Sequence, residues 1–530
     1  MQAVQLVLLL LLVFVVVFGA LARRLQTPFP IVLLIAGLAL SFIPGIPRVT
    51  LDPDFVFFVF LPPLLYAGAW TNSWRDFSYN LVSICSLTFA LVAITVLGVA
   101  FCARWAFGGF DWRLGVVLGA VVAPTDAIAA TTIAKRLGLP RRIVDVLEGE
   151  SLVNDATGLL ALEFGIAMVV YGQTPDVGEA ALRLCWLIAG GIGIGLVLGR
   201  LIEWLELRID DAPIEITTSI LVPYAAYLAA QAVRSSGVLA VVASGLYLSR
   251  QSTRFFSPRV RIQIYAVWNA LTFILNGVVF VLIGLQLPYV LAGIRGQYGL
   301  RALLLYGALF SAVVVLLRLF WVFPGARLAY FVRRRILGQR ENTPPARQIF
   351  VVGWTGMRGV IALAAALALP QMLSDGRPFP QRNLIIFLTF VTIFATLVVQ
   401  GLTLRPLIRF LKLEDDGKEE VEENKARLVA AKAGASRLDE LEGEEWVVQE
   451  MVDDMRTHYA ERRRRYSTRY QGATDDGVEA QASSFLRMQR ELLTAERQAV
   501  IKLRDAGVIN DEVLRRVERD LDLEEQSLRG

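Results

Sequence analysis

Residues 149–158 read Gly-Glu-Ser-Leu-Val-Asn-Asp-Ala-Thr-Gly, which puts two carboxylates and an amide inside an apolar segment, 143–171. That segment is long enough to cross a bilayer as a helix. A charged side chain near the bilayer centre costs about 3 kcal/mol or more, so such residues are rare and mark functional sites. The stretch therefore predicts a membrane helix that carries a functional site at Glu150, Asn154 and Asp155.

The composition supports a membrane protein. Hydrophobic residues make up 55% of the chain, the mean hydropathy is +0.53, and apolar runs of roughly 20 residues recur along it. These values exclude a soluble globular protein and predict an all-α polytopic membrane protein. The three cysteines lie within apolar runs, so we expect no disulfide.

The charge balance divides the chain near residue 412. Residues 1–411 carry 32 Lys and Arg against 19 Asp and Glu, a net charge of +13, whereas residues 412–530 carry 21 against 29, a net charge of −8. We predict a transmembrane domain over 1–411 and a soluble, amphipathic helical tail over 412–530. The basic excess lies in the membrane loops, so we expect no nucleic-acid partner.

Apolar windows predict about thirteen transmembrane helices. They cover residues 3–22, 29–43, 54–70, 81–103, 113–134, 143–171, 181–205, 214–233, 237–249, 262–287, 301–323, 348–373 and 383–411. Odd-numbered loops then hold eighteen Lys and Arg and even-numbered loops hold eight. Because basic residues accumulate on the cytoplasmic side, this bias predicts a multi-pass protein of the cell membrane with an external N-terminus and a cytoplasmic tail.

Two predicted spans contain helix-breaking sequences. The fifth contains Ala-Pro-Thr-Asp at 123–126, and the twelfth contains Gly-Trp-Thr-Gly-Met-Arg-Gly at 353–359. If spans 1–6 and 8–13 are inverted repeats, the two breaks occupy corresponding positions and would cross near the midplane, as in secondary transporters. The alternative is that Pro and Gly are simply frequent in membrane helices.

The residues near these breaks suit a hard monovalent cation. On the sixth span, Glu150 and Asn154 are one turn apart, as are Ser151 and Asp155. Oxygens of Asp126, Asp155, Thr125 and Ser151, with backbone carbonyls, would bind such a cation. A carboxylate removed from water also holds a proton more tightly, so cation and proton would compete for Asp155. The alternative is that the carboxylates only neutralise buried arginines.

Two arginines also lie within predicted spans. Arg318 falls in the eleventh and Arg358 in the break of the twelfth, and each needs an anion or a dipole because it cannot lose its proton. We expect Arg318 to pair with Glu150, which leaves Asp155 free to titrate. The single histidine, His458, lies in the tail, so imidazole cannot carry protons across the membrane.

In combination, these motifs resemble those of the bacterial sodium/proton exchangers of the first monovalent cation:proton antiporter family, over residues 1 to about 411. The resemblance implies a thirteen-helix homodimer whose six-helix core moves against a dimerisation domain, with no organic cofactor. It implies that Asp155 binds ion and proton, that Asp126, Thr125 and Ser151 complete the cation site, and that Asn154 holds the crossing of the broken helices. The Asn154-Asp155 pair is typical of electroneutral members.

One position departs from the family pattern. Many relatives have an acid after the paired prolines of the third span, where this chain has Tyr66. The sequence thus predicts a non-enzymatic antiporter that exchanges Na⁺, or alternatively Li⁺ or K⁺, for H⁺. A cation channel and a non-transporting sensor that signals through the tail are the other hypotheses.

Glycines 191, 195 and 199 in the seventh span form a flat face at four-residue spacing. We expect this face to pack inside the protomer, with a dimer contact as the alternative.

Overall fold

The computed structural model describes residues 2–43, 52–106, 110–172, 176–294, 296, 298–339, 343–373, 376–413, 417–444, 446–470 and 476–527. The chain forms two compact units, Met1–Asp415 and Asp416–Gly530. Within the described residues the regular structure is helical, apart from one isolated bridge between Met372 and Pro378. This confirms the predicted all-α class.

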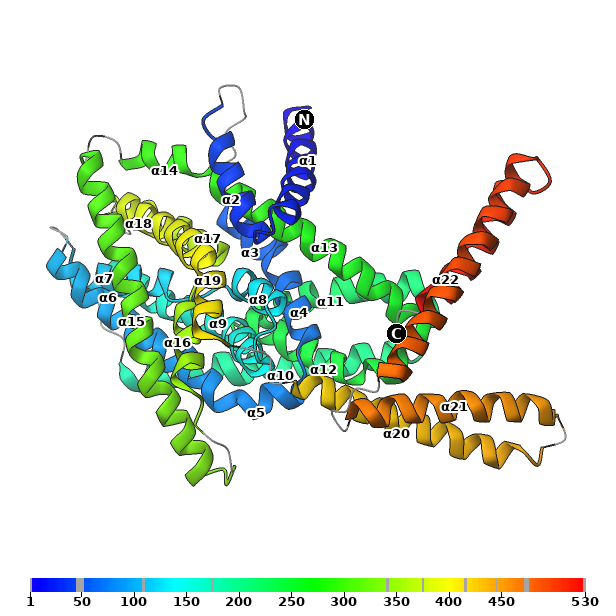
Figure 1. Ribbon diagram of the computed structural model, residues 1–530. Helices are drawn as coiled ribbons and strands as arrows, with labels where there is room; N and C mark the ends of the chain where they lie inside the picture. Colours follow the sequence, from blue (N-terminus) through cyan, green and yellow to red (C-terminus); the bar gives the residue numbers. More distant parts are fainter. Residues whose placement is uncertain are drawn as a thin grey trace. The chain divides into compact units, whose positions relative to one another are not determined.

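The described residues of the first unit form nineteen α-helices, which Figure 1 shows, and two π-helical turns. The helices are α1 (Gln2–Arg24), α2 (Phe29–Leu40), α3 (Pro53–Val59), α4 (Leu61–Thr71), α5 (Trp74–Cys85), α6 (Leu91–Ala106), α7 (Trp112–Val122), α8 (Ala127–Arg136), α9 (Arg141–Tyr171), α10 (Val177–Glu206), α11 (Ala212–Ala232), α12 (Gly237–Phe255), α13 (Pro258–Leu285), α14 (Leu287–Ile294), α15 (Leu300–Arg335), α16 (Ala346–Trp354), α17 (Val360–Leu367), α18 (Arg382–Ala395) and α19 (Gly401–Leu411). The π turns, Ser86–Ala90 and Thr396–Gln400, join α5 to α6 and α18 to α19.

Seven helical segments of the described chain are long and apolar enough to cross a membrane. They are Pro53–Thr71, Trp74–Ala106, Arg141–Tyr171, Gly178–Glu206, Pro258–Ile294, Leu300–Arg335 and Arg382–Leu411. Helices α2 and α7 are apolar but shorter. Each of the thirteen predicted segments contains helix, although several helices extend past the predicted ends and α14 lies almost wholly beyond the tenth segment. The count of thirteen spans and the inverted repeat stay predictions.

Some predicted helix ends were wrong. Helix α15 runs twelve residues past the expected end at 323, through Pro324, to Arg335. Membrane helices tolerate an internal proline, and Arg333, Arg334 and Arg335 suit the negative C-terminal end of the helix dipole. Helix α17, by contrast, ends at Leu367, three residues before Pro370, because the residue before a proline disfavours the helical conformation.

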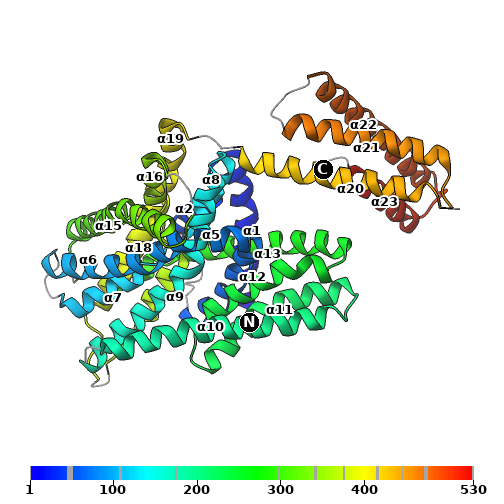
Figure 2. The ribbon, with the colours of Figure 1, turned by 90° about the horizontal axis from the view of Figure 1, so that it is seen from below.

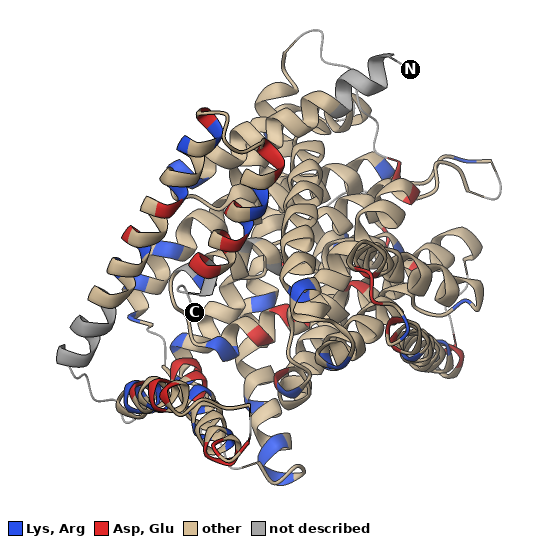
Figure 3. Ribbon diagram, turned by 90° about the vertical axis from the view of Figure 1, so that its right-hand side faces the viewer, with Lys and Arg blue, Asp and Glu red and all other residues tan. Residues whose placement is uncertain are grey.

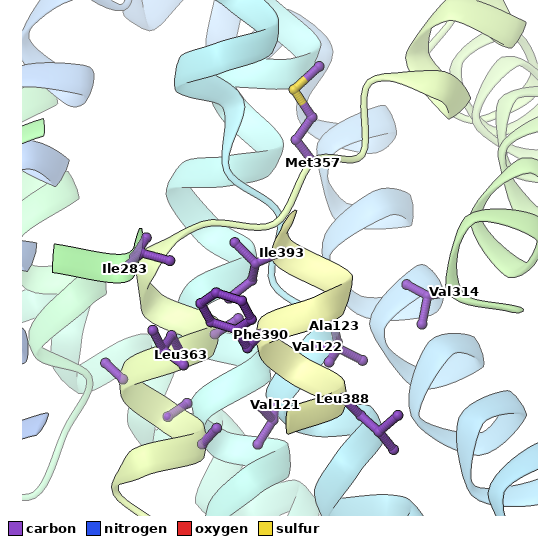
Figure 4. Close-up of a cluster of buried hydrophobic side chains, with 14 of the residues drawn as sticks. Val121, Val122, Ala123, Ile283, Val314, Met357, Leu363, Leu388, Phe390 and Ile393 are labelled. Carbon is purple, nitrogen blue, oxygen red and sulfur yellow. The ribbon is translucent and has the colours of Figure 1, made fainter. Parts of the chain in front are cut away.

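Both predicted interruptions are present. Residues 123–126 separate α7 from α8, and residues 355–359 separate α16 from α17. Figure 4 shows the buried hydrophobic cluster around them, which includes Val122 of α7, Leu363 of α17 and Phe390 of α18. Because protein interiors are close-packed, this cluster fixes the unwound segments in place.

The glycine face of α10 packs against α12, which lies beside α10 and α11 in Figure 2. A Cβ atom at Gly195 would lie 2.3 Å from the Ala240 carbonyl oxygen, and one at Gly191 would lie 2.7 Å from that of Ser236. The expected packing inside the protomer is therefore confirmed.

The described residues of the second unit form the helices α20 (Lys418–Leu441), α21 (Gln449–Tyr470), α22 (Asp476–Asp505) and α23 (Asp511–Ser527). Helix α20 packs along α21, and α22 packs along α23. Both signs of charge are distributed along these helices, whereas most of the first unit is uncharged (Figure 3). On α21, Val452 is buried, whereas Met451 and Met455 are exposed.

The contact between α10 and α12 yields a stability prediction. Gly195→Leu should lower the midpoint of thermal unfolding in detergent, because overpacking a close helix contact costs about 1–3 kcal/mol. Gly193→Leu is the matched control, since a Cβ atom there meets nothing within 4 Å. Equal midpoints for the two variants would contradict the packing described.

Candidate functional site

Helix α9 carries the 149–158 stretch through the interior of the first unit. Glu150, Asn154 and Asp155 are all buried, with Asp155 only 3% exposed. The interrupted helix packs directly on α9, because a Cβ atom at Gly158 would lie 2.3 Å from Cγ of Pro124. Gly158 therefore lets the break between α7 and α8 approach the acidic residues.

The two unwound segments touch one another. The backbone N–H of Asp126 donates a hydrogen bond to the carbonyl of Met357 at 2.8 Å. A Cβ atom at Gly359 would lie 2.3 Å from Oδ2 of Asp126, so this crossing needs a glycine. Oδ1 of Asp126 accepts a hydrogen bond from the N–H of Ile128 at 2.8 Å and caps the N-terminus of α8. The break thus presents the second oxygen of Asp126 to its surroundings.

Glu150 and Arg318 form a buried bidentate ion pair. Two guanidinium nitrogens of Arg318 donate to Oε1 and Oε2 of Glu150 at 2.5 and 2.8 Å, and both side chains are 1% exposed. Arg318 also donates to the carbonyl of Val352, near the C-terminus of α16, at 3.0 Å. Charge-assisted bidentate pairs are geometrically specific, so Glu150 joins α9 to α15 and α16.

The charge of Arg358 is balanced by backbone carbonyls, whereas that of Arg318 is balanced by a carboxylate. Its Nε donates to the carbonyl of Val122, the last residue of α7, at 3.0 Å, and a terminal guanidinium nitrogen donates to the carbonyl of Gly356. Its backbone N–H donates to Oγ1 of Thr396 at 3.1 Å. The C-terminal carbonyls of a helix carry the negative end of its dipole. Arg358 therefore satisfies carbonyls that the breaks leave without helical partners.

Thr125 links the polar side chains of α9 to the break. Its hydroxyl donates to Oε1 of Glu150 at 2.9 Å and accepts from Nδ2 of Asn154 at 2.7 Å. Its carbonyl accepts from Oγ of Ser151 at 3.1 Å. Oδ1 of Asn154 is buried without a hydrogen-bond partner among the described residues. The hydroxyl of Thr125 is thus engaged as both donor and acceptor.

Asp155 has no such partner. It lines a cavity of about 160 Å³ together with Asp126, Thr125 and Ser151. Within the part of the chain that the structure describes, no side chain donates a hydrogen bond to Asp155 and no cation pairs with it. The cavity therefore exposes one uncompensated carboxylate beside oxygens of Asp126 and Ser151, a set that suits a hard monovalent cation or a proton.

Five polar residues of the cavity lining were not predicted from the sequence: Thr71, Asn72, Thr131, Glu148 and Asn276. Asn276 of α13 lines the cavity, and no motif marked it. Glu148 of α9 also lines it and pairs with Lys135 at 2.7 Å. Because Glu148 precedes Asp155 by seven residues, or two helical turns, the shared face could have been read from the spacing.

Tyr66, the departure from the family pattern, lies outside this site. Its ring packs between Trp70 and Trp268, with centroid separations of 5.8 and 5.2 Å. The neighbouring Leu64 and Leu65 line the cavity, but Tyr66 does not. Tyr66 thus belongs to an aromatic cluster and does not line the cavity that Asp155 lines.

This chain is similar to known proteins in both sequence and fold. An uncharacterized Na⁺/H⁺ exchanger of Mycobacterium tuberculosis is 36% identical over 99% of this chain and 96% of its own length. Another from Escherichia coli K12 is 30% identical over 95% and 94% of the two chains. Both matches extend through the tail. A sodium, potassium, lithium and rubidium/H⁺ antiporter of Bacillus subtilis is 32% identical over 75% of this chain and 60% of its own.

Among solved structures, the sodium proton antiporter MjNhaP1 of Methanocaldococcus jannaschii has the same fold, with a TM-score of 0.59 and 20% identity. The match covers 78% of this chain and 99% of that one. Residues 9–410 match the family described as sodium/hydrogen exchanger, transmembrane. That match spans more than half of the chain, which therefore belongs to the sodium/hydrogen exchanger family.

Proposed function

We propose that this multi-pass membrane protein exchanges one Na⁺ for one H⁺ by competition of the two ions for Asp155. As a member of its family it is a monovalent cation/proton exchanger. The observation that supports Asp155 as the shared site is the contrast within α9. Glu150 is fully paired with Arg318, whereas Asp155 faces the cavity without a partner. A carboxylate without a permanent partner can take up and release ions in turn.

The free-energy cost of burying an ionised Asp155 without a bound ion couples the movements of the two ions. An ionised Asp155 without a bound ion is expensive to bury, so the site changes access only when it holds a proton or a cation. Either load adds one positive charge to the same carboxylate, so the loaded site has the same net charge in both cases. Exchange through Asp155 alone is therefore electroneutral. Asp126, whose Oδ1 accepts a hydrogen bond from the N–H of Ile128, serves as a further cation ligand.

The transported cation is Na⁺, with Li⁺ and K⁺ as the alternatives. The Bacillus subtilis relative is named as an antiporter of sodium, potassium, lithium and rubidium. The oxygens of Asp126, Asp155 and Ser151 could bind each of these hard cations. A series of alkali chlorides in the transport assay described below ranks them.

Two further proposals concern assembly and orientation. The protein works as a homodimer in the bilayer, which cross-linking in native membranes tests. Its N-terminus is external and its tail cytoplasmic, in keeping with the loop charges. Protease digestion of right-side-out vesicles should accordingly leave the tail intact.

Transport by Asp155 is tested in acid-loaded vesicles that contain the purified protein and a pH-sensitive dye. Added Na⁺ should dissipate the proton gradient, and a K⁺ ionophore that clamps the membrane potential should not change the rate. Asp155→Asn should abolish exchange, because an amide neither binds a proton nor neutralises a cation. The matched control is Asp145→Asn on the same helix, whose carboxylate pairs with Arg141 at 3.9 Å. Exchange by Asp155→Asn at the wild-type rate would refute the mechanism.

Competition also predicts a specific pH dependence. As pH falls, protons occupy more of Asp155, so the apparent KM for Na⁺ should rise by up to about tenfold for each pH unit. The maximal rate at saturating Na⁺ should change much less. Initial rates over a grid of pH and Na⁺ concentration separate the two. A fall in maximal rate at constant KM would indicate separate sites for the two ions.

Unlike Asp155, Glu150 should contribute to the stability of the folded protein. Glu150→Gln leaves Arg318 buried without its anion, and breaking a buried pair in this way costs about 3–5 kcal/mol. We expect a markedly lower unfolding midpoint in detergent. The control is Glu163→Gln, because Glu163 is 58% exposed and pairs with Arg183 at 3.5 Å. Equal midpoints would show that the pair is not structural.

A further inference from the structure

We propose that Glu148 and Lys135 form an ion-pair gate on the cavity, and that Glu148 binds the alkali cation before it reaches Asp155. This inference rests on the proposed function, because it assigns an entry step to the same site. Glu148 is a third acid of the cavity, separate from Asp126 and Asp155.

The placement of Glu148 supports this role. Glu148, Ser151 and Asp155 stand at helical spacings of three and four residues, so they lie along one face of α9. Seven residues of helix separate Glu148 from Asp155 by roughly 10 Å along the axis. Both side chains line the same cavity, and the Glu148 side chain is 17% exposed whereas Asp155 is 3% exposed. Glu148 therefore stands between solvent and the deeper acid.

The charges along the cavity favour a cation. Its lining includes three acids, Asp126, Glu148 and Asp155, and no Lys or Arg. A cleft lined by one sign of charge focuses its field and raises the local concentration of the opposite ion. The neighbouring acids Asp76 and Asp145 do not line the cavity, and Arg141 lies 3.7 and 3.9 Å from them. Glu148 is therefore the outermost acid of the cavity itself.

The Lys135 side chain is the part of the gate that moves. Its Nζ lies 2.7 Å from Oε1 of Glu148, and its side chain is 59% exposed. It sits in the last turn of α8, the helix whose N-terminus Asp126 caps. An ion pair whose cation is largely exposed to solvent contributes little to stability, so this one opens readily. An entering alkali cation can then replace the ammonium group on Glu148, because both carry a single positive charge.

The test compares substitutions that change the net charge of the gate in opposite directions. Glu148→Gln should raise the apparent KM for Na⁺ about threefold to tenfold at low ionic strength and leave the maximal rate unchanged. Lys135→Ala should lower the KM, because the ammonium no longer competes. The double variant should behave as Glu148→Gln alone, and Glu148→Asp should keep most of the wild-type affinity. High concentrations of an impermeant salt should reduce the differences, since they screen exposed charges.

Glu163→Gln is the matched control, since it removes an acid from the same helix beyond the cavity. Unfolding midpoints equal to the wild type should accompany the altered KM values. An unchanged KM in Glu148→Gln would overturn the gate, as would a raised KM in Lys135→Ala, which indicates a purely structural pair. Failure of the wild-type protein to exchange ions at all would instead refute the proposed function.

Discussion

The bidentate pair between Glu150 and Arg318 is the interaction on which the rest of the site depends. Both charges are buried in a membrane unit, where neither is tolerated alone. Their pairing lets α9 carry further acids without concentrating uncompensated charge at one point. It also attaches α9 to α15 and, through the carbonyl of Val352, to the end of α16. The pair is therefore both an electrostatic and a mechanical anchor.

The breaks in the two crossing helices impose a second constraint, because unpaired backbone groups in lipid cost several kcal/mol each. The structure satisfies them with side chains that the breaks themselves supply. Asp126 caps the N-terminus of α8, and Arg358 binds the C-terminal carbonyl of α7. A backbone hydrogen bond from Asp126 to Met357 then joins the two segments. The site is consequently rigid where the chain is least regular.

Much of this arrangement could be predicted from the sequence, because membrane burial makes polar residues conspicuous. The class followed from the apolar composition, the two interruptions from Pro and Gly inside predicted spans, and the Glu150–Arg318 contact from charges placed in apolar segments. The hydrogen bonds of Thr125 did not, since a hydroxyl can serve as donor or acceptor and its partners depend on the exact approach of α9. The cavity position of Glu148 was missed for a related reason, because an acid near a helix end looks like an ordinary surface residue. The length of α15 was misjudged because hydropathy falls where the helix leaves the apolar region.

Three acids on one helix therefore differ in function because they differ in what neutralises them. Arg318 is buried and cannot lose its proton, so it holds Glu150 permanently. Lys135 is largely exposed, so it holds Glu148 only weakly. No described side chain pairs with Asp155, which leaves that carboxylate to the ions in the cavity. In the mechanism that we propose, a cation passes from Glu148, whose partner is weak, to Asp155, which has none, while Glu150 stays paired with Arg318. A proton that binds Asp155 then displaces the cation.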